Sequence, residues 1–168
     1  MTIAVQRYAE THKPGVRDLI VPIQREEFGI DITYADQPDL HDIDGFYRQG
    51  AGEFWVAVDG GSVIGSIALI DIGDGMAALR KMFVAQAYRG GEHRIASRLL
   101  ETLLDHARAR GLADIYLGTT TAFLAAHRFY EKAGFDLVDE NELPPAFPRM
   151  AVDTRFYRLR LAATAVSG

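Results

Sequence analysis

A change of hydrophobic period in the middle of the chain constrains the fold most strongly. Residues 54–58 (Phe-Trp-Val-Ala-Val) and 63–70 (Val-Ile-Gly-Ser-Ile-Ala-Leu-Ile) are apolar runs separated by Asp-Gly-Gly-Ser, which is typical of two strands joined by a tight turn. A second turn at 73–75 leads to a third expected strand that ends in Lys81-Met82-Phe83-Val84. Connections this short allow only antiparallel pairing, so the sequence predicts a meander over residues 54–84.

A segment with the apolar spacing of a helix follows this meander. Apolar residues recur every three or four positions from Ile95 to Ala107, and Gly111 ends the pattern. A buried strand is expected at 114–118, and its connection through a helix implies parallel pairing with the meander. A shorter helix, capped by Thr119–Thr121, is expected through Lys132, and late strands at 135–138 and 151–161.

The first third of the chain predicts one strand and two helices. The strand is expected at residues 3–8, one helix from Val16 to Phe28, and a short helix from Pro38 through Tyr47, with a loop at 29–37 between the helices. Together these elements predict an α/β (α+β) fold: a mixed, mostly antiparallel sheet of about seven strands flanked by about four helices. We expect residues 1–168 to form a single domain.

Composition excludes several classes of function. The 168 residues hold 18 Lys and Arg against 23 Asp and Glu, a net charge of −5, which argues against a nucleic-acid partner. No cysteine is present, so disulfides, thiolate metal sites and a cysteine nucleophile are excluded. The five histidines have no metal-ligand spacing, and we expect no metal. The sequence begins without a signal-peptide pattern and lacks an apolar run long enough for a bilayer, so we expect a cytoplasmic protein with no membrane partner.

Two segments carry the candidate chemistry. In residues 82–96 a loop with Arg89, Gly90 and Gly91 leads into the long helix. Free backbone N–H groups and the positive end of a helix make such a junction a site for phosphate, although Gly90 and Gly91 alone would also suit an ordinary turn. In residues 125–135, Ala126 and Tyr130 precede Glu-Lys-Ala-Gly-Phe. Together the two segments resemble the acetyl-CoA motifs of the GNAT superfamily of N-acetyltransferases, from about Phe54 to Phe135.

The resemblance implies a GNAT-like fold, acetyl-CoA as cosubstrate, and a set of site residues. Tyr130 is implied as the catalytic acid, and the residues implied to contact the cosubstrate are Met82, Phe83, Val84, Arg89, Gly90, Gly91, Arg94, Ile95, Ala96, Ser97, Thr119, Ala126 and Phe129. Three features depart from the family pattern. The loop after Arg89 is two residues longer, Arg94 takes the place of the central glycine, and Phe123 takes the place of a cofactor-contacting asparagine. Arg94 can replace that glycine if its φ is negative.

The expected reaction is attack of an amine on a thioester. It requires a base, donors for the developing oxyanion and an acid for the departing thiolate. The resemblance assigns the oxyanion contact to a backbone N–H of the strand 82–84 and the acid to Tyr130, which a plain core role would also explain. His127 is expected to be a surface residue without a catalytic role. The base stays open between Glu26, Glu27 and water, because the usual strand position, Ala77 to Lys81, holds no carboxylate.

The expected function is therefore acetyl-CoA-dependent N-acetyltransfer to a primary amine of a small molecule or peptide. With no cysteine, direct attack in a ternary complex is favoured over a covalent enzyme intermediate. A non-catalytic module that binds or senses acyl-CoA is the alternative. The acceptor stays open, although an acidic chain favours a cationic one, and a homodimer is one possible assembly.

Overall fold

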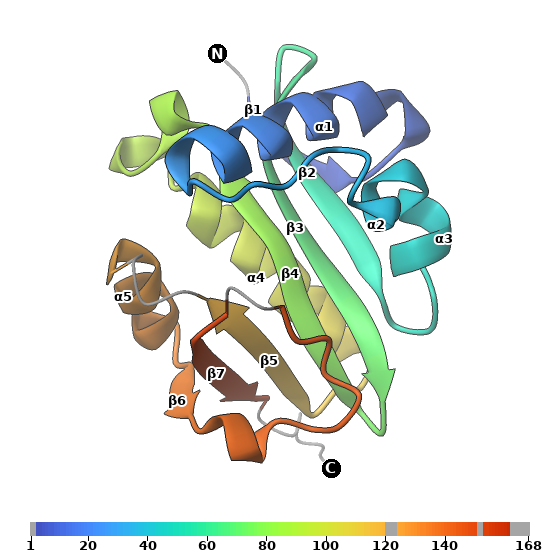
Figure 1. The fold of residues 1–168 in the computed structure, drawn as a ribbon, viewed down its shortest axis with the longest axis vertical. Coiled ribbons are helices and arrows are strands. Elements are labelled where there is room, and N and C mark those ends of the chain that lie inside the picture. Colours follow the sequence, from blue (N-terminus) through green and yellow to red (C-terminus); the bar gives the residue numbers. More distant parts are fainter. Residues whose placement is uncertain (1–2, 120–123, 151–152, 162–168) are drawn as a thin grey trace.

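The computed structural model describes residues 3–119, 124–150 and 153–161. These residues form a seven-stranded sheet in the order β1-β2-β3-β4-β5-β7-β6 (Figure 1). The strands are β1 (Ile3–Arg7), β2 (Glu53–Asp59), β3 (Ser62–Gly73), β4 (Met76–Val84), β5 (Asp114–Thr119), β6 (Asp136–Val138) and β7 (Arg155–Arg160). Every neighbouring pair is antiparallel except β4 and β5, which are parallel. The mixed, mostly antiparallel sheet predicted from the sequence is confirmed.

Five α-helical segments accompany the sheet in the described part of the chain. They are α1 (Lys13–Pro22), α2 (Pro38–His41), α3 (Ile43–Tyr47), α4 (Ile95–Ala109) and α5 (Leu124–Lys132). The single helix expected from Pro38 to Tyr47 is divided at Asp42, whose φ of −143° is not helical. The Asp42 side chain accepts a hydrogen bond from the Gly45 N–H at 3.0 Å and so begins α3. None of the described helices is both long and apolar enough to cross a membrane.

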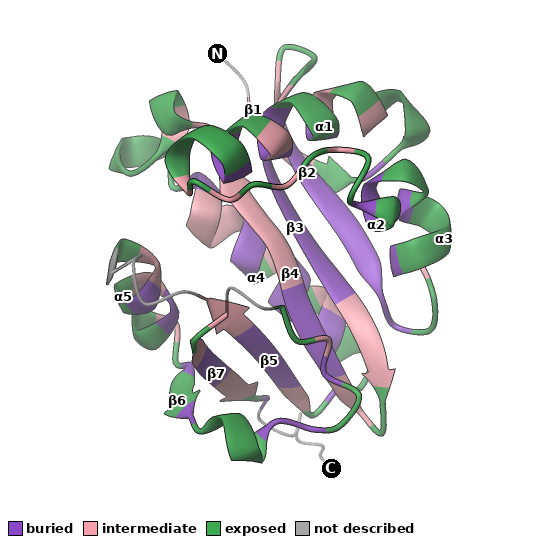
Figure 2. Ribbon diagram, viewed as in Figure 1, coloured by how far each residue is buried: buried purple, intermediate pink, exposed green. Residues whose placement is uncertain are grey.

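The helices cover both faces of the sheet. Alternate residues of β2 point to opposite faces, as strand geometry requires. Phe54 and Val56 pack with α1, α2 and α3 on one face, whereas Trp55 and Ala57 pack with α4 and α5 on the other. Buried residues therefore follow the centre of the sheet, and the outward surfaces of the helices are exposed (Figure 2). The predicted amphipathic helix α4 buries Ile95, Leu99, Leu100, Leu103, Leu104 and Ala107.

The first helix differs from the sequence-based expectation. It begins at Lys13 rather than Val16 and is α-helical only to Pro22, after which residues Ile23–Glu27 form a π-helical turn. Proline has no N–H to donate to the preceding turn, so the hydrogen-bond ladder is interrupted there. The Phe28 N–H then bonds to the Ile23 carbonyl at 3.0 Å, five residues back. This wider turn carries Gln24 and Phe28 toward the centre of the sheet.

Three further boundaries correct the sequence-based expectations. Of the expected cap Thr119–Thr121, Thr119 is the last residue of β5, whereas Thr120 and Thr121 lie outside the described part of the chain, and α5 is described only from Leu124. The strand expected at 151–161 spans Arg155–Arg160, and residues 151–152 lie outside the described part of the chain. Phe123 also lies outside it. The strand expected at 135–138 is β6, Asp136–Val138.

Two irregularities of β4 shape the centre of the molecule. Between the pairs Ser66–Phe83 and Ala68–Arg80, two residues of β4 oppose one residue of β3, which is a β-bulge at Lys81 and Met82. On its other side, β4 pairs with β5 only from Met76 to Ala78, although both strands continue further. The two parallel strands therefore diverge beyond Ala78, and their facing backbone edges are unpaired there.

Candidate active site

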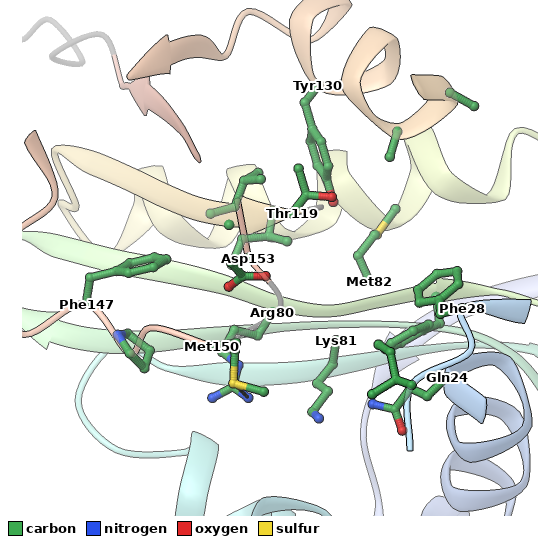
Figure 3. Close-up of a pocket in the computed structure, with 18 of the residues that line it drawn as sticks. Gln24, Phe28, Arg80, Lys81, Met82, Thr119, Tyr130, Phe147, Met150 and Asp153 are labelled. Carbon is green, nitrogen blue, oxygen red and sulfur yellow. Dashed lines mark hydrogen bonds between the residues drawn. The ribbon is translucent and has the colours of Figure 1, made fainter. Parts of the chain in front are cut away.

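A cavity of about 380 Å³ opens where β4 and β5 diverge. Its walls are the two strands, the turn after α1, helix α5 and the Pro-rich loop before β7 (Figure 3). The lining residues are Gln24, Phe28, Ile30, Leu79, Arg80, Lys81, Met82, Phe83, Arg89, Leu117, Gly118, Thr119, Ala125, Ala126, Tyr130, Phe147, Pro148, Met150 and Asp153. Unpaired backbone N–H and C=O groups on both strand edges can hydrogen-bond an extended ligand laid between them.

Tyr130 extends from α5 into this cavity (Figure 3). Its ring packs edge-on against Phe129 and Phe135, with ring centres 5.4 and 5.5 Å away, which fixes its direction. Among the described residues, none forms a hydrogen bond with its hydroxyl. Burial raises the pKa of Tyr130 above its ordinary value, so the hydroxyl keeps its proton at neutral pH. A proton donor thus faces the cavity without an acceptor among the described residues.

Lys81 holds the bulge of β4 in place. It has a φ of 55°, a left-handed conformation that costs a non-glycine residue about 1–2 kcal/mol. Its buried side chain donates to Gln37 Oε1 at 2.7 Å and lies 3.5 Å from Asp39 Oδ2. Burial lowers the pKa of Lys81, and the neighbouring Asp39 opposes that change. Gln24 and Gln37 exchange two hydrogen bonds of 2.8 and 3.0 Å, which join the bulge to the turn after α1.

The loop between β4 and α4 presents an open helix start. Gly90 and Gly91 both have a φ of 66°, and a Cβ at either position would meet nothing within 4 Å. The first N–H groups of an α-helix have no intrahelical acceptor. In α4 the preceding residue, Arg94, provides no side-chain cap for them either. Arg94 was expected to replace the family's glycine with a negative φ, and this expectation is wrong, because its φ is 50°. An arginine therefore keeps the left-handed conformation that glycine adopts easily, with some backbone strain.

The structure brings together part of the predicted site. Six of its residues line the cavity: Met82, Phe83, Arg89, Thr119, Ala126 and Tyr130. Gly90, Gly91 and Arg94 lie in the exposed loop beside it, and Ala96 and Ser97 stand in the first turn of α4. The side chains of Ile95, Val84 and Phe129 pack in the core on the α4 face, so any contact with a ligand would come from their backbone.

The candidate bases from the sequence do not line the cavity. Glu26 is exposed, and Glu27 forms an ion pair with Arg89 at 2.6 Å. His127 is not the surface residue expected, because it is only 4% exposed and its ring lies 6.2 Å from that of Tyr157. Helix α5 turns this residue toward the sheet.

Two charged residues of the cavity were missed by the sequence analysis. Arg80 extends from β4, and Asp153 comes from the segment before β7 (Figure 3). Burial raises the pKa of Asp153, and a backbone hydrogen bond from Met150 and the charge of Arg80 partly oppose that change. Asp153 is the only carboxylate that lines the cavity among the described residues. No local sequence pattern identifies Asp153, because the pairing of β7 with β5 brings this residue to the cavity.

Comparison with known proteins assigns the chain to a family. The model of the Acetyltransferase (GNAT) family matches residues 17–135. The chain belongs to the GNAT acetyltransferase family. Two solved bacterial acetyltransferase structures are similar over almost the whole chain. An acetyltransferase of the GNAT family from Staphylococcus aureus is 35% identical, with a TM-score of 0.89 over 96% of this chain and 100% of that one. An acetyltransferase from Streptococcus agalactiae is 34% identical, with a TM-score of 0.90 over 95% and 98%.

Curated relatives of this GNAT chain are longer proteins. The N-acetylaspartate synthetase of Xenopus tropicalis is 36% identical over 130 residues, which are 75% of this chain and 47% of that protein. The chain spans about half the length of the curated relatives it matches. An acetyltransferase structure from Salmonella typhimurium, solved with acetyl-CoA, shares the fold, with a TM-score of 0.76 at 18% identity, over 100% of this chain and 99% of that one. The GNAT-like fold expected from the sequence is confirmed.

Proposed function

We propose that this chain is an acetyl-CoA-dependent N-acetyltransferase that acetylates a primary amine of a small molecule or peptide. One observation carries the proposal: the diverging strands β4 and β5 enclose a cavity that receives the hydroxyl of Tyr130, which has no hydrogen-bond partner among the residues that the structure describes. A thioester placed between the strand edges would lie beside a proton donor for its sulfur. Membership of the GNAT family and the acetyl-CoA held by the Salmonella typhimurium protein support the same reading.

The loop and helix start fit the phosphate end of acetyl-CoA. Gly90 and Gly91 leave open space where other residues would have side chains, so a pyrophosphate can approach the backbone closely. The uncapped N–H groups of α4 and the positive end of its dipole favour an anion there. Arg89 and Arg94 would add charge-assisted hydrogen bonds, although Arg89 must then be shared with Glu27.

The thioester end would lie against the bulge of β4. The bulge at Lys81 and Met82 interrupts the β3–β4 ladder, and a backbone N–H of the segment Met82 to Val84, which begins in this bulge, would stabilise the developing oxyanion. Lys81 and its partners Gln37 and Asp39 hold this part of the strand rigid. The attacking amine nitrogen forms the new C–N bond, the C–S bond breaks, and Tyr130 gives its proton to the departing sulfur. The proton released by the amine passes to solvent or to a carboxylate, and Tyr130 regains a proton from solvent.

Direct attack in a ternary complex fits the composition, because the chain has no cysteine to carry an acyl group. Initial rates at varied concentrations of both substrates should give intersecting double-reciprocal lines. Parallel lines would indicate a covalent enzyme intermediate and contradict direct attack.

Titration calorimetry with acetyl-CoA tests the proposal first. We expect a single site per chain and a rise in melting temperature with added acetyl-CoA, because a ligand that binds only the folded state stabilises it. No heat and no shift at millimolar acetyl-CoA would contradict the proposal. The N-acetylaspartate synthetase relatives make amino acids a natural part of the acceptor panel for the kinetic assays.

A further inference from the structure

The charges of the cavity are unevenly paired. Arg80, Lys81 and Arg89 are its cations among the described residues, and the structure pairs Lys81 with Asp39 and Arg89 with Glu27. Arg80 has no carboxylate of the described chain within 4.0 Å of its nitrogens. Its recorded polar contact is with the Met150 sulfur at 3.8 Å, which is a weak acceptor. A permanently charged guanidinium with five donors thus lines the cavity without an anion.

Asp153 has no cationic partner among the described residues, although its carboxylate has a backbone hydrogen bond with Met150. It lines the same cavity, and no cation of the described chain lies within 4.0 Å of its carboxylate. Room for the carboxylate comes from Gly118 on β5, since a Cβ at that position would stand 2.6 Å from Asp153 Oδ2. An anion held in a partly buried position without a cation is unfavourable in the empty protein. Such a group is expected where a ligand supplies the missing charge.

Arg80 and Asp153 belong to the same part of the cavity. Figure 3 shows both beside Met150 and Phe147, which come from the loop before β7. Asp153 feels the charge of Arg80, yet the two groups are too far apart for an ion pair. Two groups of opposite charge that line one cavity without forming an ion pair suit a molecule that carries one charge of each sign.

We propose that Arg80 and Asp153 form a two-point acceptor subsite for an amino acid, with the carboxylate on Arg80 and the amino group on Asp153. This inference rests on the proposed N-acetyltransferase function and names its acceptor class. A bidentate contact would match the guanidinium to the carboxylate, and Asp153 would accept a hydrogen bond from the amine. A polyamine would leave Arg80 unpaired and place a second cation near it and Lys81. The acidic net charge of the chain favoured a cationic acceptor, but the charges inside the cavity do not.

Matched acceptors test the subsite. Thiol release from acetyl-CoA is measured with proteinogenic amino acids, with their α-carboxamides and with the corresponding decarboxylated amines. We expect the amino acid of the best series to have a kcat/KM about 10- to 100-fold above those of its carboxamide and amine, the usual effect of one charge-assisted contact. Equal or better rates with the carboxamide or the decarboxylated amine would overturn the subsite while leaving the proposed acetyltransferase function intact.

Variants of Arg80 identify the residue responsible. Arg80→Gln should raise KM for the amino acid by about 10- to 100-fold, leave KM for acetyl-CoA unchanged, and abolish the preference over the carboxamide. Arg80→Lys keeps the charge but loses the bidentate guanidinium, so its KM for the amino acid should lie between those of the wild type and Arg80→Gln. Arg108→Gln removes one exposed charge at the far end of α4 and should behave like the wild type. Retention of the amino-acid preference in Arg80→Gln would contradict the inference.

A binding measurement separates failure of the subsite from failure of the enzyme. If the wild type neither binds acetyl-CoA nor releases thiol with any acceptor, the proposed function is wrong. Calorimetric titration of the same amino acids into the protein then decides the subsite alone: binding that Arg80→Gln abolishes supports it, and absence of binding overturns it. Circular dichroism and melting temperature establish that each variant is folded.

Discussion

The carboxylate of Asp153 lies against the backbone of Gly118, so closely that a Cβ on residue 118 would stand 2.6 Å from Oδ2. Gly118 belongs to β5 beyond the point where this strand leaves β4, and Asp153 precedes β7, which pairs with β5 on its other side. Because Gly118 has no side chain, the carboxylate of Asp153 can reach the cavity. The carboxylate of Asp153 therefore lies beside the part of β5 that has separated from β4, where we propose that the acceptor binds.

Gly118→Ala is therefore expected to act through Asp153. The new methyl group must displace the carboxylate, and KM for an amino-acid acceptor should rise by about tenfold, with a smaller effect on KM for acetyl-CoA. Steady-state kinetics of Gly118→Ala, Asp153→Asn and the double variant check this. If the two residues act as one, the double variant should be little worse than Asp153→Asn alone. Fully additive losses would mean that Gly118 acts independently of Asp153.

Asp153→Asn should make the protein more stable at neutral pH. Burial raises the pKa of Asp153 in the folded state, so its contribution to stability is fully present below the unfolded pKa and is lost as the pH rises through the folded one. Asparagine carries no charge, so the stability of the variant does not fall as the pH rises through the folded-state pKa of Asp153. Melting temperatures from pH 4 to 8 should show the variant above the wild type at pH 7 and a gap that narrows toward pH 4. A variant less stable at pH 7 would show that the ionised carboxylate supports the fold.

The buried ion pair of Lys81 and Asp39 is expected to be a structural requirement of the bulge. Lys81→Met leaves Asp39 without its cation in a buried site, which should lower the free energy of unfolding by about 3–5 kcal/mol. The Tyr47 hydroxyl, 2.5 Å from Asp39, would remain as its hydrogen-bond donor. Urea denaturation measures the loss. Combining Lys81→Met with Asp39→Asn should recover part of it, and no recovery would show that the lysine acts through packing alone.

Gly91→Glu is expected to weaken acetyl-CoA binding strongly. Glutamate adds bulk and negative charge beside the first turn of α4, where the pyrophosphate is proposed to bind, and the φ of 66° adds strain. Gly111→Glu is the matched control, because Gly111 also has a positive φ, of 75°, and open space, but follows the other end of the same helix. Calorimetry should show weaker binding only for Gly91→Glu. Equal affinities in the two variants would place the pyrophosphate elsewhere.

Much of the fold was predictable because its signals are local. The glycine turns at 60–61 and 73–75 fix antiparallel neighbours, and the apolar stripe of α4 predicts the helix that joins β4 to β5. The interruption at Pro22 was missed because a helical pattern of apolar residues continues across it. The break at Asp42 was missed for the same reason.

The candidate site was predictable only where a motif marks it. Tyr130 and the loop before α4 stand in segments that resemble a family, and Tyr130 indeed lines the cavity. Arg80 and Asp153 have no such signal, since their roles depend on which distant residues leave them unpaired. The left-handed φ of Lys81 was also invisible, because the bulge arises from the register between β3 and β4 and from the contact with Asp39.

Thiol release from acetyl-CoA by the wild type and by Tyr130→Phe tests whether the chain catalyses acetyl transfer with Tyr130 as the acid. We expect amine-dependent release of CoA, with the acetylated amine detected by mass spectrometry. Tyr130→Phe should lower turnover at pH 7 by roughly 10²-fold, the lower part of the range for a positioned acid, because a thiolate with a pKa near 8.5 already leaves readily. The loss should shrink above that pH. Tyr116→Phe, a matched change of another buried tyrosine outside the cavity, should turn over like the wild type. Acetyl-CoA binding without amine-dependent release would contradict the proposed acetyl transfer and favour a non-catalytic acyl-CoA-binding module. Full turnover in Tyr130→Phe at pH 7 would contradict the proposed role of Tyr130 as the acid.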